Sequence, residues 1–322
     1  MTATQWLVMS CMMSLLTLAL STPAMAETAW VTDNDRQPLA EAWWTGPMMA
    51  NSAAALPKGH YLIEPYVYDV RSSRVDSFGS LTYMEYGITD RLMAGLIPTF
   101  SYNRVSEGPD SHGVGTGDVS VLAQYSLTSF HEDSAMPAMA LMVQETLPTG
   151  RYDRLNHPLA DATGSGAYST TVQLNTQTYF WMPNGRILRM RFNVGGAFSQ
   201  RTSVDDESVY GTPRGFHGHA KPGAAVLVNA AWEYSMTQRW VLAFDLAYRR
   251  SQGTRVQGTT VVDGGIMPVA YRTRSSASFG FAPAIEYNWS SRIGMLAGVR
   301  VFTGGHNSPT TITPAVALNY VH

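Results

Sequence analysis

The chain has 322 residues, of which 14% are charged, and its formal net charge at pH 7 is −2. So few and so balanced charges exclude a basic groove for nucleic acid and an acidic interaction tail. The mean hydropathy of −0.10 argues against membrane-spanning helices, which need about 18 or more consecutive apolar residues.

Residues 1–26 have the pattern of a secretory signal peptide. An apolar run ends in Ala24, Met25 and Ala26, and these small flanking alanines predict cleavage after Ala26. The alternative is a single membrane anchor, which the short run and the good cleavage site disfavour. The only cysteine, Cys11, lies in this segment, so the mature chain would have no disulfide and no cysteine-based metal site.

From His60 onward the chain alternates apolar and other residues in twelve segments. Alternation of this kind predicts extended strands, each with one apolar and one polar face. The segments are 60–70, 79–88, 92–102, 118–127, 138–147, 167–180, 188–199, 224–234, 240–250, 272–289, 293–303 and 310–322.

The connections between these segments alternate between short turns and long polar loops. The turns are 87–91, 182–186, 235–239 and 289–293, and the loops are 103–117, 148–166, 200–221, 251–271 and 304–309. One connection, 128–137, is longer than the turn that its place predicts. Strands of about ten residues, an even strand number and loops gathered at one end are typical of outer-membrane β-barrels.

The stretch 185–201 shows how the faces are assigned. Met190 and Phe192 alternate with Arg189 and Arg191. A soluble sandwich would alternate in the same way, but with strands nearer five or six residues. We therefore predict an all-β fold, a 12-stranded antiparallel transmembrane barrel over residues 59–322, with apolar side chains toward lipid. The sheet must close because every backbone polar group in lipid has to be paired.

The charged residues that alternation places in the lumen are the candidate pore-lining residues. They are Glu64, Glu85, Asp118, Arg189, Arg191, Glu233, Asp245, Arg249, Arg272, Arg274, Glu286 and Arg300. The two signs are mixed, whereas strongly ion-selective pores build rings of one sign. The set therefore predicts either a salt-bridge network that narrows the lumen or a passage for neutral solutes. Residues 27–58 lack alternation, and we expect them to lie in the periplasm or to enter the lumen as a plug.

Three motifs could carry chemistry, and each has a simpler interpretation. The glycines of 113–118 (GVGTGD) are followed by a strand, whereas a phosphate-binding loop needs a helix there. His306 and Ser308 have the H-x-S spacing found in one outer-membrane phospholipase family, but no residue is apparent that would orient the histidine. His217 and His219 alone leave a metal site short of ligands. We predict no catalytic residue, no cofactor and no metal, and hence no enzyme.

Several stretches resemble the outer-membrane family named for the meta-pathway of phenol degradation. They are TGPMMANSAAALPKGHYLIEPYV, MEYGITDRLMAGLIPTFSY, GTGDVSVLAQYSL and LMVQETLPTGRYDRL. The resemblance runs from Thr45 to the C-terminus and is best between 45 and 180. It implies a barrel that moves small aromatic or hydrophobic compounds across the outer membrane, and it implies no particular binding residues.

The sequence thus predicts an outer-membrane channel for passive passage of small solutes, in a Gram-negative bacterium, reached by export through the periplasm. The expected partners are outer-membrane lipid and lipopolysaccharide, the assembly machinery and a small-molecule solute, with no nucleic acid. Two alternatives stay open at this point: a structural or adhesive barrel without transport, and an outer-membrane hydrolase.

Overall fold

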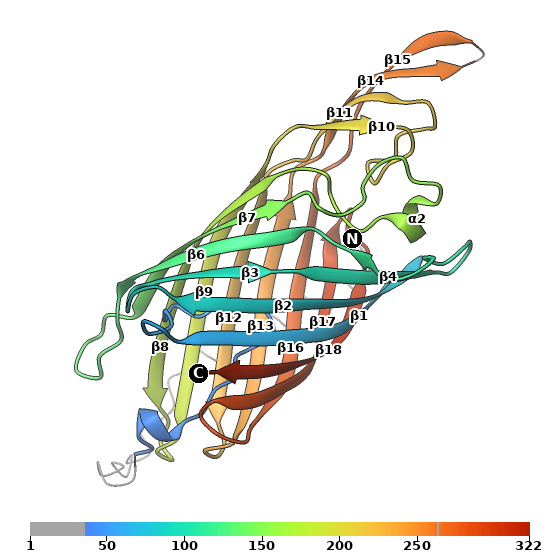
Figure 1. Cartoon of the computed structure of the whole chain (residues 1–322). Coiled ribbons are helices and arrows are strands. Elements are labelled where there is room, and N and C mark those ends of the chain that lie inside the picture. Colours follow the sequence, from blue (N-terminus) through green and yellow to red (C-terminus); the bar gives the residue numbers. More distant parts are fainter. Residues whose placement is uncertain (1–35, 263) are drawn as a thin grey trace.

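The computed structural model of the protein describes residues 36–262 and 264–322, so the expected signal peptide and Cys11 lie outside the described residues. Its main feature is a closed antiparallel β-barrel (Figure 1). Closure is visible in the pairing of the first strand, which bonds to both the second and the last strand of the barrel. No helix among the described residues is long and apolar enough to cross a membrane.

Twelve strand passes form the wall, as the sequence predicted, when the consecutive strands β3 and β4 are counted as one pass and the two-residue β5 is left out. The wall strands are β1 (Tyr61–Arg71), β2 (Val75–Gly87), β3 (Leu92–Ile97), β4 (Thr99–Val105), β6 (Val119–Thr128), β7 (Ala138–Leu147), β8 (Ser169–Trp181), β9 (Ile187–Ser199), β12 (Ala225–Ser235), β13 (Trp240–Ser251), β16 (Ser276–Asn288), β17 (Ile293–His306) and β18 (Thr311–Val321). Pro98 separates β3 from β4 because proline has no N–H to donate to the ladder.

The two faces of the wall differ as the alternation predicted. Phe192, Phe244 and Phe281 point outward and are 46%, 39% and 38% exposed, whereas Arg189 and Arg191 point inward and are 6% and 7% exposed. A sandwich or other soluble fold would bury the aromatic set and expose the arginines. A bilayer requires this arrangement of an apolar outer surface and a polar interior.

Two predicted loops contain a second sheet instead of irregular chain. It consists of β10 (Thr202–Asp205), β11 (His217–Lys221), β14 (Arg255–Val262) and β15 (Gly265–Arg272), paired in that order. Pairing between β11 and β14 joins loops that are separated in sequence by two wall strands, which no local pattern reveals. The predicted strand 272–289 accordingly begins at Ser276, because the chain before it belongs to the second sheet.

The second sheet lies beyond the long-loop end of the barrel, and β14 and β15 project furthest from the wall (Figure 1). Its inner face is a small apolar core in which Val204, Phe216 and Val256 are buried against Tyr210 and Tyr271. Short turns face the periplasm in barrels of this kind, so we call this end the extracellular end and the other the periplasmic end. The remaining short elements are β5 (Gly115–Thr116), the 3-10 turn η2 (Leu39–Glu41) and the single helical turn α2 (Pro158–Asp161).

Candidate functional site: the barrel lumen

Residues 37–58, here called the lumen segment, enter and leave the barrel at its periplasmic end. The Gln37 amide N–H donates to the Gly185 carbonyl at 3.0 Å in the turn between β8 and β9. At the other end of the segment, Lys58 N–H donates to Asp90 Oδ1 at 3.0 Å in the turn between β2 and β3. Both ends of the segment are therefore fixed to periplasmic turns.

Between these ends the segment reaches the middle of the lumen, where two buried carboxylates bind its backbone. Asp245 Oδ2 accepts Met48 N–H and Asp245 Oδ1 accepts Ala50 N–H, both at 3.0 Å. Glu286 Oε2 accepts Thr45 N–H at 2.6 Å. Buried backbone N–H groups need a partner, and a charged acceptor gives the stronger hydrogen bond. Side chains of the wall thus supply the hydrogen-bond acceptors that a neighbouring strand would otherwise supply to the segment.

Wall residues of β9 and of β6, which is across the barrel from β13, bind the carbonyl groups of the same stretch. Arg191 Nη1 donates to Ala50 O at 2.9 Å, and Asn193 Nδ2 donates to Asn51 O at 3.1 Å. Gln124 Nε2 donates to Ala54 O at 3.2 Å. The segment is therefore held by several strands around the lumen, mostly through its main chain.

An ion cluster beside the segment joins β9 to β12. Glu233 is fully buried and accepts hydrogen bonds from both Nε and Nη2 of Arg189, the first at 2.7 Å. Arg191 Nε lies 3.0 Å from Glu233 Oε2, as an ion pair without good hydrogen-bond geometry. The Arg189 guanidinium also lies over the Trp44 ring, 4.4 Å from its centroid. The cluster thus connects two wall strands with an aromatic side chain of the lumen segment.

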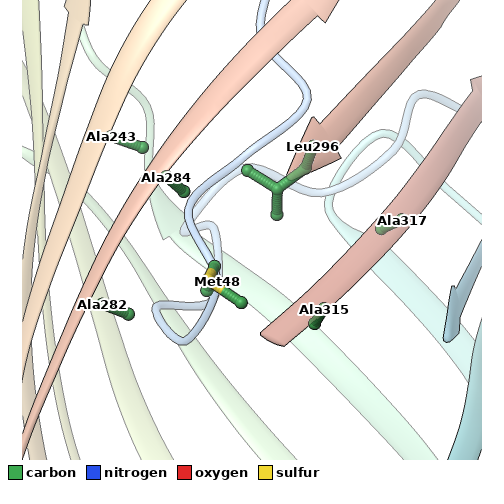
Figure 2. Packing of buried hydrophobic residues seen from close by; sticks show 7 residues of the cluster. All are labelled: Met48, Ala243, Ala282, Ala284, Leu296, Ala315 and Ala317. Atoms are coloured by element: carbon green, nitrogen blue, oxygen red, sulfur yellow. The ribbon is translucent and has the colours of Figure 1, made fainter. Parts of the chain in front are cut away.

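Small wall residues make room for the tip of the segment. Met48 is 7% exposed and packs against wall side chains that are mostly alanine (Figure 2): Ala243, Ala282, Ala284, Leu296, Ala315 and Ala317. A Cβ on Gly298 would lie 2.6 Å from the Met48 sulfur, and a Cβ on Gly294 would lie 2.2 Å from Thr45 Oγ1. Larger side chains at these two wall positions would collide with the segment, so the inner surface of the wall is complementary in shape to the segment.

Cavities lie between the segment and the wall in the described part of the chain, and two of them line the segment directly. The larger has a volume of about 230 Å³, and its lining mixes apolar groups with a few polar ones: Trp44, Tyr83, Glu85, Met93, Leu122, Gln124 and Met142 are among them. The smaller has a volume of about 120 Å³ and is lined partly by Glu64, Tyr66 and Arg191. The periplasmic half of the lumen is therefore narrowed by the segment but not filled.

The structure divides the sequence-predicted lumen charges into groups by strand and by height. Arg189, Arg191, Glu233, Asp245 and Glu286 come from the neighbouring strands β9, β12, β13 and β16 in the periplasmic half of the lumen, where they bind one another or the segment. Glu64 and Glu85 line the cavities on the β1 and β2 side, with Glu64 accepting a hydrogen bond from Asn319.

The other five candidates lie nearer to the extracellular end or beyond it. Arg249 and Arg300 point into the outer half of the lumen, and Arg249 lies over the Phe302 ring at 4.8 Å. Among the described residues neither of these arginines has a carboxylate within ion-pair distance. Asp118 stands at the extracellular rim and accepts hydrogen bonds from Gly150 N–H and Ser165 N–H. Two positions lie outside the wall: Arg272 ends β15, and Arg274 is in the connection to β16.

Sequence reasoning listed only charged residues, and it missed the neutral polar groups that hold the segment. Gln124, Asn288 and Gln177 bind Ala54 O, Trp43 O and Ser52 Oγ respectively. Alternation could have found them, because they occupy the same inward positions as the charges. Their partners at 43–54 give no periodic signal and could not have been found this way.

The motifs considered for chemistry have structural roles in the described part of the chain. His217 Nδ1 lies 2.9 Å from Asp205 Oδ1 in the second sheet, and this contact, with that of Arg154, lowers the pKa of Asp205. His306 Nε2 lies 3.4 Å from Ser275 Oγ, and no hydrogen bond joins it to Ser308 among the residues described. In the GTGD stretch, Gly117 N–H donates to Thr99 O, which fixes the entry to β6.

Comparison with known proteins agrees with this geometry. The chain matches the family described as "Putative MetA-pathway of phenol degradation" over residues 52–314. No curated protein matches it significantly. An outer membrane channel from Pseudomonas putida F1 has a TM-score of 0.62 and 15% identity, and the match covers 85% of this chain and 100% of the channel.

Two further solved structures are more distant outer-membrane barrels. The KdgM porin has a TM-score of 0.39 and 8% identity, covering 80% of this chain and 98% of the porin. The Pseudomonas putida toluene transporter TodX has a TM-score of 0.39 and 11% identity, covering 87% of this chain and 95% of the transporter. Because the family match spans most of the sequence, this protein belongs to the phenol-degradation family and is a 12-stranded outer-membrane β-barrel.

Proposed function

We propose that the protein is an outer-membrane channel for small solutes whose passage requires the lumen segment to move. The observation that carries this proposal is how the segment is held. It has no strand pairing with the wall along residues 42–58, and its main chain is bound by single side chains such as Asp245, Glu286 and Arg191. Separate contacts of this kind can be exchanged for water one at a time, whereas a ladder strand leaves cooperatively.

The size and lining of the larger cavity support aromatic compounds as solutes. An engineered apolar cavity of about 150 Å³ binds benzene, so about 230 Å³ accommodates one substituted ring. Trp44, Met93 and Leu122 offer apolar surface, while Glu85 and Gln124 can bind a hydroxyl or similar substituent. The family description, which refers to phenol degradation, points to the same class of compound.

The outer half of the lumen favours anionic or electron-rich solutes. Arg249 and Arg300 stand on the extracellular side of the ion cluster without a neutralising carboxylate in the described chain. A low-dielectric cleft lined by one sign of charge raises the local concentration of opposite charge. An aromatic carboxylate would be drawn inward there, and a neutral ring could stack on a guanidinium as Phe302 does. The proposed route includes export through the periplasm, with residues 1–26 as signal peptide, and insertion by the assembly machinery.

Removing the segment should open the channel. A variant in which a short Gly-Ser linker replaces residues 38–55 is expected to show several-fold higher single-channel conductance and faster benzoate flux into liposomes than wild type. The barrel should still assemble, because its strands pair with one another and water can hydrate the lumen charges. Heat-modifiable mobility in detergent gels checks assembly. If neither protein passed any small solute, the channel proposal would fail.

A second candidate function is contact with a partner through the extracellular end. The β14–β15 hairpin carries exposed apolar side chains, with Ile266 77%, Val261 56% and Met267 53% exposed. An adhesive barrel without transport would bind its partner but pass no solute, so measuring solute flux separates the two functions. A hydrolase is the least supported of the three candidate functions, because His306 contacts Ser275 in place of Ser308.

A further inference from the structure

Three cations lie side by side across the second sheet. Lys221 of β11 is directly opposite Arg255 of β14, and Arg255 is directly opposite Arg272 of β15. Directly opposite residues of an antiparallel sheet project from the same face, with Cβ atoms about 4.5–5.5 Å apart. The three positive side chains therefore form a row on one face, and all three are exposed.

Nothing in the described chain neutralises this row. No carboxylate lies within ion-pair distance of Lys221, Arg255 or Arg272 among the residues described. The carboxylate of the same sheet face, Asp205, is engaged by Arg154 and His217 instead. Like charges placed directly opposite each other destabilise a sheet. A row of three is therefore expected to be compensated by an anion from outside the chain.

The row faces the exterior of the barrel and not its mouth. Alternate residues of the sheet, such as Ala220, Val256 and Tyr271, form its apolar core on the opposite face. The three cations line a cavity of about 270 Å³ together with Phe198, which is 59% exposed and continues the lipid-facing set of β9. Below it on the same outward face, Val226 of β12 and Phe279 of β16 are 48% exposed each.

A ligand of this cavity would thus meet positive charge above and an apolar surface below. Phe198 stands near the extracellular end of β9, where the apolar belt of the wall ends. The edge of an apolar belt is where we expect the phosphate groups of the outer leaflet. Basic clusters next to the edge of the hydrocarbon layer bind anionic lipid head groups. Guanidinium groups suit phosphate because they can donate two parallel hydrogen bonds.

We propose that Lys221, Arg255 and Arg272 form a binding site for a phosphate group of lipopolysaccharide, whose acyl chains lie along Phe198 and the wall beneath it. The site is on the outside of the barrel and is independent of solute passage through the lumen. It would fix the projecting second sheet against the outer leaflet and replace the missing counter-charge of the row.

The test uses the full-length barrel purified in detergent. Binding of lipid A that carries both phosphates, of dephosphorylated lipid A and of inorganic phosphate is measured by native mass spectrometry. The test variant combines Lys221→Gln, Arg255→Gln and Arg272→Gln. A matched control combines Arg91→Gln, Arg239→Gln and Arg292→Gln, which removes the same charge from exposed positions in the periplasmic turns.

The test variant should bind phosphorylated lipid A about a hundredfold more weakly than wild type, given the usual contribution of each basic residue near a lipid surface. The control should bind as wild type does, and dephosphorylated lipid A should bind wild type as weakly as phosphorylated lipid A binds the test variant. Heat-modifiable mobility and solute flux should be unchanged in both variants. Equal binding by test variant and wild type, or an equal loss in the control, would overturn the proposal. If inorganic phosphate competed at concentrations similar to those of lipid A, the proposal that the bound phosphate group comes from a lipid would be overturned.

Discussion

A double variant, Asp245→Asn with Glu286→Gln, is expected to open the channel more often than wild type. The two carboxylates accept three backbone hydrogen bonds from the lumen segment. A hydrogen bond to a charged acceptor is worth about 1 kcal/mol more than one to a neutral acceptor, and Asp245→Asn also leaves one acceptor oxygen for two N–H groups. The free energy needed to release the segment would then fall by about 3 kcal/mol. This corresponds to roughly a hundredfold increase in the open population.

Single-channel recording in planar bilayers measures this as open probability, while the conductance of the open state should stay that of the wild type. Glu85→Gln is the matched control, because Glu85 lines the larger cavity but accepts no hydrogen bond from the segment in the described residues. An open probability equal to that of wild type in the double variant would show that these contacts do not hold the passage closed.

The second large effect concerns the ion cluster. Glu233→Gln should lower the free energy of unfolding by about 3–5 kcal/mol, because it leaves Arg189 and Arg191 buried without their counter-charge. Urea unfolding in lipid vesicles, followed by tryptophan fluorescence, measures the change. The variant Arg189→Met, Glu233→Leu, Arg191→Met should regain most of the loss, since well-packed apolar residues can replace a buried ion cluster without large cost.

Two results would contradict this view of the cluster. If Glu233→Gln unfolded at the same urea concentration as wild type, the lumen around Arg189 would be wet enough to hydrate its charge. If the apolar triple variant were less stable than Glu233→Gln, the contacts of Arg191 with the lumen segment, and not the ion pairs, would dominate the stability of this region.

The barrel wall could be predicted from sequence because lipid imposes one simple rule on every strand. Outward positions such as Phe244 and Phe281 must be apolar along the whole span, so period-two alternation persists for ten or more residues. The same rule placed Arg189, Arg191 and Asp245 inside. It could not give their partners, because pairing depends on the register between strands and on the height of each residue in the lumen.

The second sheet and the path of the lumen segment could not be predicted in this way. Lys221 and Arg255 become neighbours only when two extracellular loops pair, and nothing in either loop encodes the other. The segment is bound through its backbone to residues such as Asp245, which lies 195 positions from Ala50. Hydrogen bonds of backbone amides produce no pattern in the side chains. The sequence therefore could not decide between the periplasm and the lumen for residues 27–58.

A reversible tether tests most directly whether solutes pass only when the lumen segment moves. A Cβ on Gly294 would lie 2.2 Å from Thr45 Oγ1 and 2.4 Å from Asn288 Oδ1, so the sulfurs of Thr45→Cys and Gly294→Cys come within reach of a disulfide once both neighbouring side chains shift to relieve these collisions. With Cys11→Ser as background, these are the only cysteines in the chain. The bond would tie the segment to β17, and its other end already continues into β1.

Benzoate flux into liposomes is then measured with the same protein oxidised and reduced, beside each single-cysteine variant. Flux should be lost on oxidation and should return on reduction to the level of the single variants, which should not respond to either treatment. Equal flux in the oxidised and reduced double variant would show that solutes pass without movement of the segment, which would contradict the proposed function.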